Sequence, residues 1–275
     1  MKTLSRLYIA LILFFLYAPL AVMIVFSFNS SSSVWVFEGF SADWYLGLIS
    51  DTTMLTALEH TLIVAVLSAL ISTVLGTAAA VGIMALRNKV AKKLIMGATN
   101  IPMMNADIVT GISLMFLFVF IGKLLGLQES LGFTTVLIAH ITFNLPYVIL
   151  SVLPKLKQTD ANLHEAALDL GCTPFKAFFK VILPSISTGI ATGMIMAFTL
   201  SLDDFVISYF TCGDYQTLPI IIYNMTKKSV TPDTYALSTL IFIVIFLLLI
   251  FYNMLQTRAE KKHAAATRRF KGAAK

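Results

Sequence analysis

The stretch NLHEAALDLGCTPFKAFFKVILP, residues 162–184, decides the fold. Its first part predicts a short helix with both ends specified. Asn162 is a suitable N-cap, and Glu165 stands at the third helical position, from which its side chain reaches back to the cap. Gly171 supplies the left-handed residue that ends the helix.

A second helix is predicted directly after the first. Thr173 caps it, and Pro174 occupies its first position, where a missing N–H group costs nothing. Phe175, Phe178 and Phe179 then recur at helical spacing and form an apolar stripe. Helix signals of this kind also fit an amphipathic elbow on a membrane surface, so they do not assign a function alone.

The rest of the chain is too apolar for a soluble protein. Of its 275 residues, 58% are apolar and 12% are charged, whereas about 25% of residues are charged in soluble domains. The mean hydropathy is +0.86. These values predict an integral membrane protein, and no nucleophile–base set or metal cluster suggests an enzyme. Cys172 and Cys212 are too far apart for a redox pair or a zinc site.

Long apolar stretches predict six transmembrane helices in a single domain, 1–275. Each stretch is long enough to cross ~30 Å of hydrocarbon. The predicted spans are 7–28, 61–86, 94–122, 131–153, 181–210 and 234–257, with a cytoplasmic loop at 154–180 and a basic C-terminal tail at 258–275.

The distribution of lysine and arginine predicts the orientation. Of the 20 such residues, only Lys123, Lys227 and Lys228 fall on one side of the six spans, and the other 17 fall on the opposite side. Because basic residues accumulate in cytoplasmic loops, both termini are expected inside a bacterial plasma membrane. A secretory signal is the alternative for the N-terminus, but its apolar run is longer than a signal peptide requires and ends without a cleavage site.

Three acids interrupt the predicted spans. Asp107 lies 15 residues from Gly122, which on a straight helix is ~22 Å and places it in the inner half of its span. Asp203 and Asp204 lie about 18 and 19 residues beyond Ser185, near the outer end. Adjacent helical residues point about 100° apart, so one of this pair is expected to face the bundle. With no Lys or Arg in these spans, the acids favour a cationic substrate.

Aromatic side chains gather in the predicted outer segment, 29–60. Trp35, Trp44 and Tyr45 could attract a cation at the entrance through their ring faces. The alternative is the aromatic belt found at membrane interfaces, which we favour for Trp35 and leave open for Trp44.

Two further features predict helix packing. Gly189 and Gly193 form a small-x-x-x-small pair that allows close helix approach, for which an interface between subunits is one candidate. His140 is interpreted as an interhelical hydrogen-bonding residue rather than a proton relay.

The loop motif resembles a known family. Glu165-Ala166-Ala167, Gly171 and Val181-Ile182-Leu183-Pro184 are similar in order and spacing to the EAA loop of ABC importer permeases. This resemblance implies a type I (MetI-like) bundle in which Glu165, Ala166, Ala167 and Gly171 form a coupling helix against a cytoplasmic ATPase. The chain has no phosphate-binding G-x-x-x-x-G-K-[ST] motif, so ATP and Mg²⁺ are expected in that partner and no cofactor in this chain.

Three other segments narrow the resemblance. Residues 105–114, 140–147 and 201–208 look like those of spermidine/putrescine importer permeases of the PotC type. The family implies a second permease in a heterodimer, two ATPase subunits, an extracytoplasmic polyamine-binding protein and no nucleic acid. By resemblance the substrate pathway contains Asp107, Asp203 and Asp204, and more weakly Trp44. The alternatives are an ABC permease for another small organic cation or metabolite, and a gradient-driven secondary transporter.

Overall fold

The computed structural model describes residues 2–31, 36–160, 162–228 and 232–247, together with Ile250 and Met254. In this part the chain forms helices and loops, with an isolated antiparallel bridge between Asn29 and Phe40. The all-α prediction is confirmed. Trp35, the tail 258–275 and the last part of the predicted span 234–257 lie outside the described residues.

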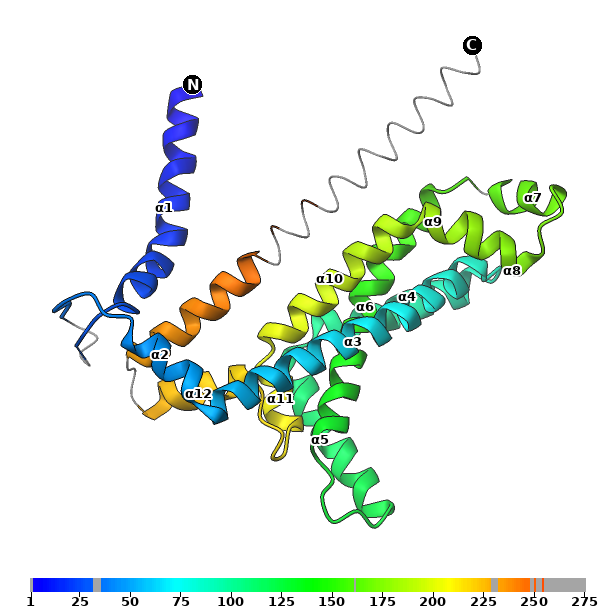
Figure 1. Ribbon diagram of the computed structural model, residues 1–275. Coiled ribbons are helices and arrows are strands. Elements are labelled where there is room, and N and C mark those ends of the chain that lie inside the picture. The colour runs from blue at the N-terminus through cyan, green and yellow to red at the C-terminus, as the bar shows by residue number, and fades with distance from the viewer. Residues whose placement is uncertain are drawn as a thin grey trace. The chain divides into compact units, whose positions relative to one another are not determined.

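The helices follow one another with short connections. In chain order, and as labelled in Figure 1, they are α1 (Lys2–Phe26), α2 (Asp43–Ser50), α3 (Thr52–Ala85), α4 (Lys89–Met104), α5 (Asp107–Leu124), α6 (Phe133–Gln158), α7 (Asn162–Asp169), α8 (Pro174–Ala177), the π-helix η1 (Phe178–Ile182), α9 (Leu183–Ser185), α10 (Ser187–Asp203), α11 (Val206–Thr211) and α12 (Leu218–Lys228). A further apolar helix covers Pro232–Leu247.

Among the described residues, four helices are long and apolar enough to cross a membrane. They are Arg6–Phe26 within α1, and the whole of α3, α5 and α6. The pair Pro174–Ser185 and Ser187–Asp203 adds a fifth crossing if it forms one span bent by 69°. The count of six, and the orientation, stay predictions.

Two predicted spans are not straight helices. The span 94–122 is divided between α4 and α5 at Asn105, whose backbone is extended with φ −81° and ψ 149°. Pro102 removes one backbone donor from the last turn of α4, and the Asp107 carboxylate favours a new helix start. The span 181–210 bends at Ile186 and breaks after Asp203. The lengths of these two apolar stretches therefore did not reveal where the helices end.

The chain divides into two compact units. The first comprises the described residues of Met1–Ala57 and Ile220–Leu255, and the second comprises those of Leu58–Pro219. The second unit has a core of small and branched apolar side chains from α3, α6 and α10. The buried members of this core are Ala69, Ala80, Ile83, Val148, Ile149, Val152, Leu153, Leu156, Ile186 and Ala197.

Close packing of α10 on α6 depends on two glycines. A Cβ atom at Gly193 would lie 3.1 Å from Cα of Val148, and one at Gly189 would lie 2.9 Å from the carbonyl oxygen of Ser151. The predicted close approach of this pair is confirmed, but its suggested place at an interface between subunits is wrong. The backbone atoms that face the two glycines belong to α6 of the same chain.

Gly189→Ala is expected to destabilise the chain by about 1–3 kcal/mol, because the new methyl group meets backbone that cannot yield without moving α6. The measurement is the unfolding temperature of the importer complex in detergent. The matched control is Gly82→Ala on α3, where a Cβ meets no atom within 4 Å. Equal unfolding temperatures for the two variants would show that α10 does not rest on Gly189.

Candidate functional site

Asp204 points into the helix bundle and starts α11. The backbone leaves helical geometry there, with φ −64° and ψ 119°, between α10 and α11. Oδ2 of Asp204 accepts hydrogen bonds from the N–H group and the hydroxyl of Ser208, both at 2.8 Å, and Oδ1 accepts from the N–H of Ile207 at 3.3 Å. Nε2 of His140, on α6, lies 3.5 Å from the same Oδ2. Asp204 therefore caps α11 and joins it to α6.

The adjacent aspartate has the opposite environment. The side chain of Asp204 is 9% exposed and that of His140 is 1% exposed, whereas Asp203 is exposed. We expected one member of the pair to face the bundle, and the structure places Asp204 there. Asp203 is left as the accessible carboxylate at the end of α10.

Asp107 lies in the first turn of α5 and is exposed. The N–H groups of Val109 and Thr110 bond to the carbonyl of Ala106, at 2.9 and 3.2 Å, which completes the start of the helix. Nδ2 of Asn105 donates to the hydroxyl of Thr110 at 3.2 Å. The carboxylate of Asp107 is therefore positioned beside a break in the chain, as Asp203 is.

The starts of α5 and α11 lie side by side. A Cβ at Gly111, one turn after Asp107, would lie 2.9 Å from the ring of Phe210 and 3.4 Å from Cα of Ile207. Further along, both segments approach the connection between α5 and α6. Gly122 lies against Ser130, and Gly213, which follows α11, lies against Leu131. The short helix α11 therefore packs against the first part of α5.

The breaks at both acids bear on the depths that we predicted for them. Counting along straight helices placed Asp107 in the inner half of the membrane and Asp203 near its outer end. The chain breaks beside both acids, so counts along straight helices do not apply, and their depths in the membrane stay predictions.

One turn before the break at Asp204, a buried hydroxyl connects three helices. Oγ of Ser201, on α10, lies 2.8 Å from Oγ of Ser68 on α3, and it accepts a hydrogen bond of 2.8 Å from Nδ2 of Asn144 on α6. All three side chains are buried. This contact fixes the last turn of α10, from which Asp203 extends.

The loop that resembles the coupling loop contains the predicted helix α7, with one difference at its start. The helix begins at Asn162 itself, and Oδ1 of Asp160 accepts the N–H of Asn162 at 3.0 Å. Our prediction of Asn162 as the cap is wrong, because the more upstream carboxylate reaches the first free N–H group. The side chain of Glu165 is exposed and, among the described residues, makes no hydrogen bond to a cap.

The end of α7 is as predicted. Gly171 has φ +82°, its N–H bonds to Leu168 at 2.8 Å, and the N–H of Cys172 bonds to Ala167 at 3.1 Å. These two bonds form the Schellman motif that ends helices with glycine. Ala167 is buried, and Ala166 is exposed next to Glu165. The exposed residues of α7 therefore include the small Ala166 and the acidic Glu165 and Asp169.

The second helix of the loop starts as predicted but does not stay regular. The hydroxyl of Thr173 accepts the N–H of Lys176 at 3.4 Å, and Pro174 occupies the first position of α8. The chain then widens into η1. The ring of Phe175 is 73% exposed and packs on Phe179, with centroids 4.6 Å apart.

Trp44 belongs to the first unit, where it holds a loop. Its Nε1 donates to the carbonyl of Asn29 at 2.7 Å, and the hydroxyl of the neighbouring Tyr45 lies 2.6 Å from Oγ of Ser27. Asn29 is fully buried. The polar ends of both rings are thus used within the loop, and a role for Trp44 in a substrate pathway stays a prediction.

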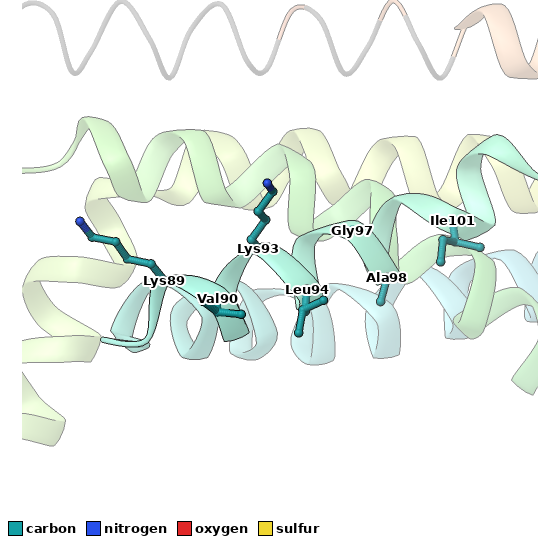
Figure 2. Close-up of a pocket in the computed structure, with 7 residues that line it drawn as sticks. All are labelled: Lys89, Val90, Lys93, Leu94, Gly97, Ala98 and Ile101. Atoms are coloured by element: carbon teal, nitrogen blue, oxygen red, sulfur yellow. The ribbon is translucent and has the colours of Figure 1, made fainter.

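A pocket of about 990 Å³ lies along α4 and contains none of the predicted acids. Figure 2 shows its seven lining residues, all from α4, with Lys89 and Lys93 near one end and Leu94 and Ile101 further along. Two lysines repel a cationic ligand, so this pocket is a poor candidate for a cation site.

Comparison with protein families now gives the class of protein. A sequence model of the family "Binding-protein-dependent transport system inner membrane component" matches residues 72–263. The chain belongs to this family. It is therefore an inner-membrane transport component, which agrees with the apolar helices described above.

Individual relatives match over most of this permease. The spermidine/putrescine transport system permease protein PotC of Escherichia coli (strain K12) is 40% identical over 249 residues, which cover 90% of this chain and 91% of that protein. The putrescine transport system permease protein PotI of the same strain is 37% identical, with 90% and 89% covered. The PotC protein of Haemophilus influenzae is 36% identical over 245 residues, with 89% and 92% covered.

Solved structures show the same fold. One is a bacterial ABC transporter involved in the import of the acidic polysaccharide alginate, with a TM-score of 0.72, 15% identity, and coverage of 94% of this chain and 95% of that chain. Another is the MetNI methionine ABC transporter in an inward-facing conformation, with a TM-score of 0.60, 18% identity, and coverage of 76% and 99%. At these identities the likeness concerns the fold alone. The predicted ABC importer permease fold is confirmed.

Sequence reasoning missed most of the buried polar contacts around the break between α10 and α11 of this permease. His140 was expected to bond between helices and does so, to Ser208 of α11 at 2.9 Å. Ser208, Ser201 and Asn144 were not predicted to act, because a single hydroxyl or amide in an apolar run has no spacing that marks it. Polar residues inside predicted spans were the available signal.

Asp204→Asn is expected to lower the stability of the permease by about 1–3 kcal/mol, whereas Asp203→Asn leaves it nearly unchanged. An asparagine keeps one acceptor oxygen but turns an NH₂ group toward either the N–H groups of α11 or His140. The unfolding temperature of the importer complex in detergent measures the difference. If both variants lost the same stability, Asp204 would not be the cap that holds α11.

Proposed function

We propose that this permease is the membrane-spanning subunit through which an ATP-driven ABC importer carries polyamines, spermidine or putrescine, into the cytoplasm. The observation that carries this proposal is the pair of exposed carboxylates beside two breaks in the chain, Asp107 at the start of α5 and Asp203 at the end of α10. The spans 94–122 and 181–210 contain no Lys or Arg. The names of relatives at 36–40% identity support the same substrate.

The chemistry of polyamines suits this arrangement. Each ammonium group separated from water needs a counter-charge, and an unpaired acid within a membrane costs about 2.5–3.5 kcal/mol on insertion scales. A flexible cation with several charges can engage Asp107 and Asp203 in turn. Asp204 uses its oxygens inside the bundle, so we assign it to positioning rather than to substrate contact.

We further propose the partners of a complete importer. A second permease forms a heterodimer with this chain, an extracytoplasmic protein delivers the polyamine, and two ATPase subunits bind ATP and Mg²⁺. The family description supports dependence on a binding protein. One solved relative of similar fold is a complex with a periplasmic protein. The absence of a phosphate-binding loop motif from the sequence supports separate ATPases, with no cofactor in this chain.

In this importer, α7 is the coupling helix. Glu165 and Ala166 are exposed on it, and Ala167 and Gly171 hold its inner side and its end. Closure of the ATPases on ATP would displace α7, and the displacement would switch the bundle between outward and inward access. The binding protein can supply selectivity, because acids that bound a polyamine tightly would delay its release.

The second candidate is an ABC permease for another small organic cation. The exposed carboxylates are equally consistent with such a cation and with a polyamine, since they recognise charge rather than chain length. Gradient-driven transport is not supported by the family, whose description names a binding-protein-dependent system.

The test is ATP-dependent uptake of labelled spermidine by cells with and without this gene, with excess unlabelled putrescine as competitor. Loss on deletion and recovery on complementation are expected in a host without another polyamine importer. Asp107→Asn and Asp203→Asn should each raise the apparent KM for spermidine by about tenfold, since each removes one counter-charge. Glu129→Gln, in an exposed loop, is the matched control. If spermidine uptake does not depend on the gene, the polyamine proposal fails, and another small organic cation becomes the candidate substrate.

Glu165→Gln is expected to reduce uptake by about tenfold while the helix content of the permease stays the same. The glutamine keeps the size of the side chain and removes the charge offered to the ATPase. Circular dichroism and co-purification of the ATPase are measured beside uptake. Asp169→Asn, an exposed acid on the same helix, is the control. If the Glu165 variant transports and retains ATPase as the parent does, the charge at 165 has no part in coupling.

A further inference from the structure

Three buried polar side chains join α6 to the break between α10 and α11. Nε2 of His140 lies 2.9 Å from Oγ of Ser208 and 3.5 Å from Oδ2 of Asp204. His140 is 1% exposed and Ser208 is fully buried. The ring of Phe143 packs edge-on against the imidazole at a centroid distance of 5.2 Å, so the imidazole is held in place.

The single hydroxyl proton of Ser208 determines the direction of these bonds. Oγ of Ser208 donates to Asp204 at 2.8 Å, so this proton is not available to His140. The contact of 2.9 Å between Oγ of Ser208 and the imidazole therefore requires a hydrogen on Nε2. The same N–H group faces the Asp204 carboxylate. His140 is thus a donor to this pair in both its neutral and its protonated form.

This donor stabilises the break itself. Asp204 satisfies the N–H groups of Ile207 and Ser208, which have no partner within the short helix α11. A buried carboxylate is costly unless several donors surround it. Donation from His140 and Ser208 keeps Asp204 inside the bundle. His140, from a different helix, therefore secures the cap of α11.

The position of Asp203 depends on this contact. Asp203 precedes Asp204 by one peptide bond, and the backbone at Asp204 is extended, so the two side chains point to different sides. While Asp204 is held inward, Asp203 is directed away from the core, where it is exposed. If Asp204 were released, rotation about its backbone would move both carboxylates.

We propose that His140 is a positioning residue of the cation pathway, which through Ser208 and Asp204 locks the break between α10 and α11 and sets the position of the Asp203 carboxylate. The proposal rests on the proposed function in so far as Asp203 contacts the transported polyamine. The geometry of the lock is independent of which cation is carried.

The kinetic test uses the complete importer and labelled spermidine. His140→Leu removes the donor and should raise the apparent KM by about tenfold, with the maximal rate per transporter within about twofold of the parent. His140→Gln places an amide N–H at a similar reach and should restore KM to within about threefold. In an Asp203→Asn background, His140→Leu should change KM by less than about twofold, because its effect passes through Asp203.

A merely structural role predicts a different result. Loss of packing would lower the maximal rate or the amount of transporter equally in both backgrounds, and glutamine would not rescue it. That result would overturn the proposal. So would a double variant, His140→Leu with Asp203→Asn, whose increase in KM equals the product of the two single increases.

A labelling test decides the geometry without any substrate. In an importer with Cys172→Ser and Cys212→Ala, Asp203→Cys is labelled with 2-aminoethyl methanethiosulfonate, a cationic thiol reagent. The rate should fall at least about threefold with His140→Leu and stay near the parental rate with His140→Gln. Equal rates in all three would overturn the proposal. If the parent importer does not carry spermidine, the proposed function fails, and this labelling test decides the role of His140 alone.

Discussion

A backbone N–H group in hydrocarbon needs a hydrogen-bond partner, because each unpaired group costs several kcal/mol. This constraint governs the two places where the chain leaves helical geometry inside an apolar segment, at Asn105 and at Asp204. At the second place the Asp204 carboxylate supplies the missing acceptors, and His140 compensates the carboxylate. The start of α11, and with it the packing against α5, depends on this one buried acid.

The constraint also explains why two adjacent aspartates differ in role. They have the same side chain and neighbouring positions, but the backbone at the break directs one inward and one outward. The inward acid accepts hydrogen bonds inside the protein, while the outward acid, at the last residue of α10, is exposed. An exposed acid at a break avoids the desolvation cost that a carboxylate buried in the middle of a helix would have.

The sequence predicted those features that depend on local chemistry. Gly171 ends α7, and Thr173 and Pro174 start α8, because a few neighbouring residues contain all that these signals need. Apolar length also predicted α1 and α6 to within about five residues at each end, but α3 begins at Thr52, nine residues before the predicted start and inside the predicted outer segment 29–60.

Features that depend on a distant partner were not predictable in this way. The break at Asp204 requires His140, which is 64 positions earlier in the chain, and the close approach at Gly189 requires the backbone of Ser151. Counting residues also assumes that a span has no break, so the depths of the acids in the membrane stay predictions. The acids at 107, 203 and 204 were recognised by their type and by resemblance. Only the hydrogen bonds in the structure separate Asp204, which we assign to positioning, from the two exposed acids, for which we propose substrate contact.

These contacts also constrain how the proposed importer can alternate. α7 packs on η1 and α8, and the chain turns by 69° at Ile186, which is fully buried against the core of α3 and α6. A displacement of α7 would thus act on α10 at a fixed pivot, ~25 Å from Asp203 along the helix. However, α10 is held to α6 at Gly189 and Gly193, α6 to α11 through His140, and α11 to α5 at Gly111. Asp107 and Asp203 would therefore move as one body, so access would change by movement of this body against a neighbouring subunit rather than by separation of the two acids.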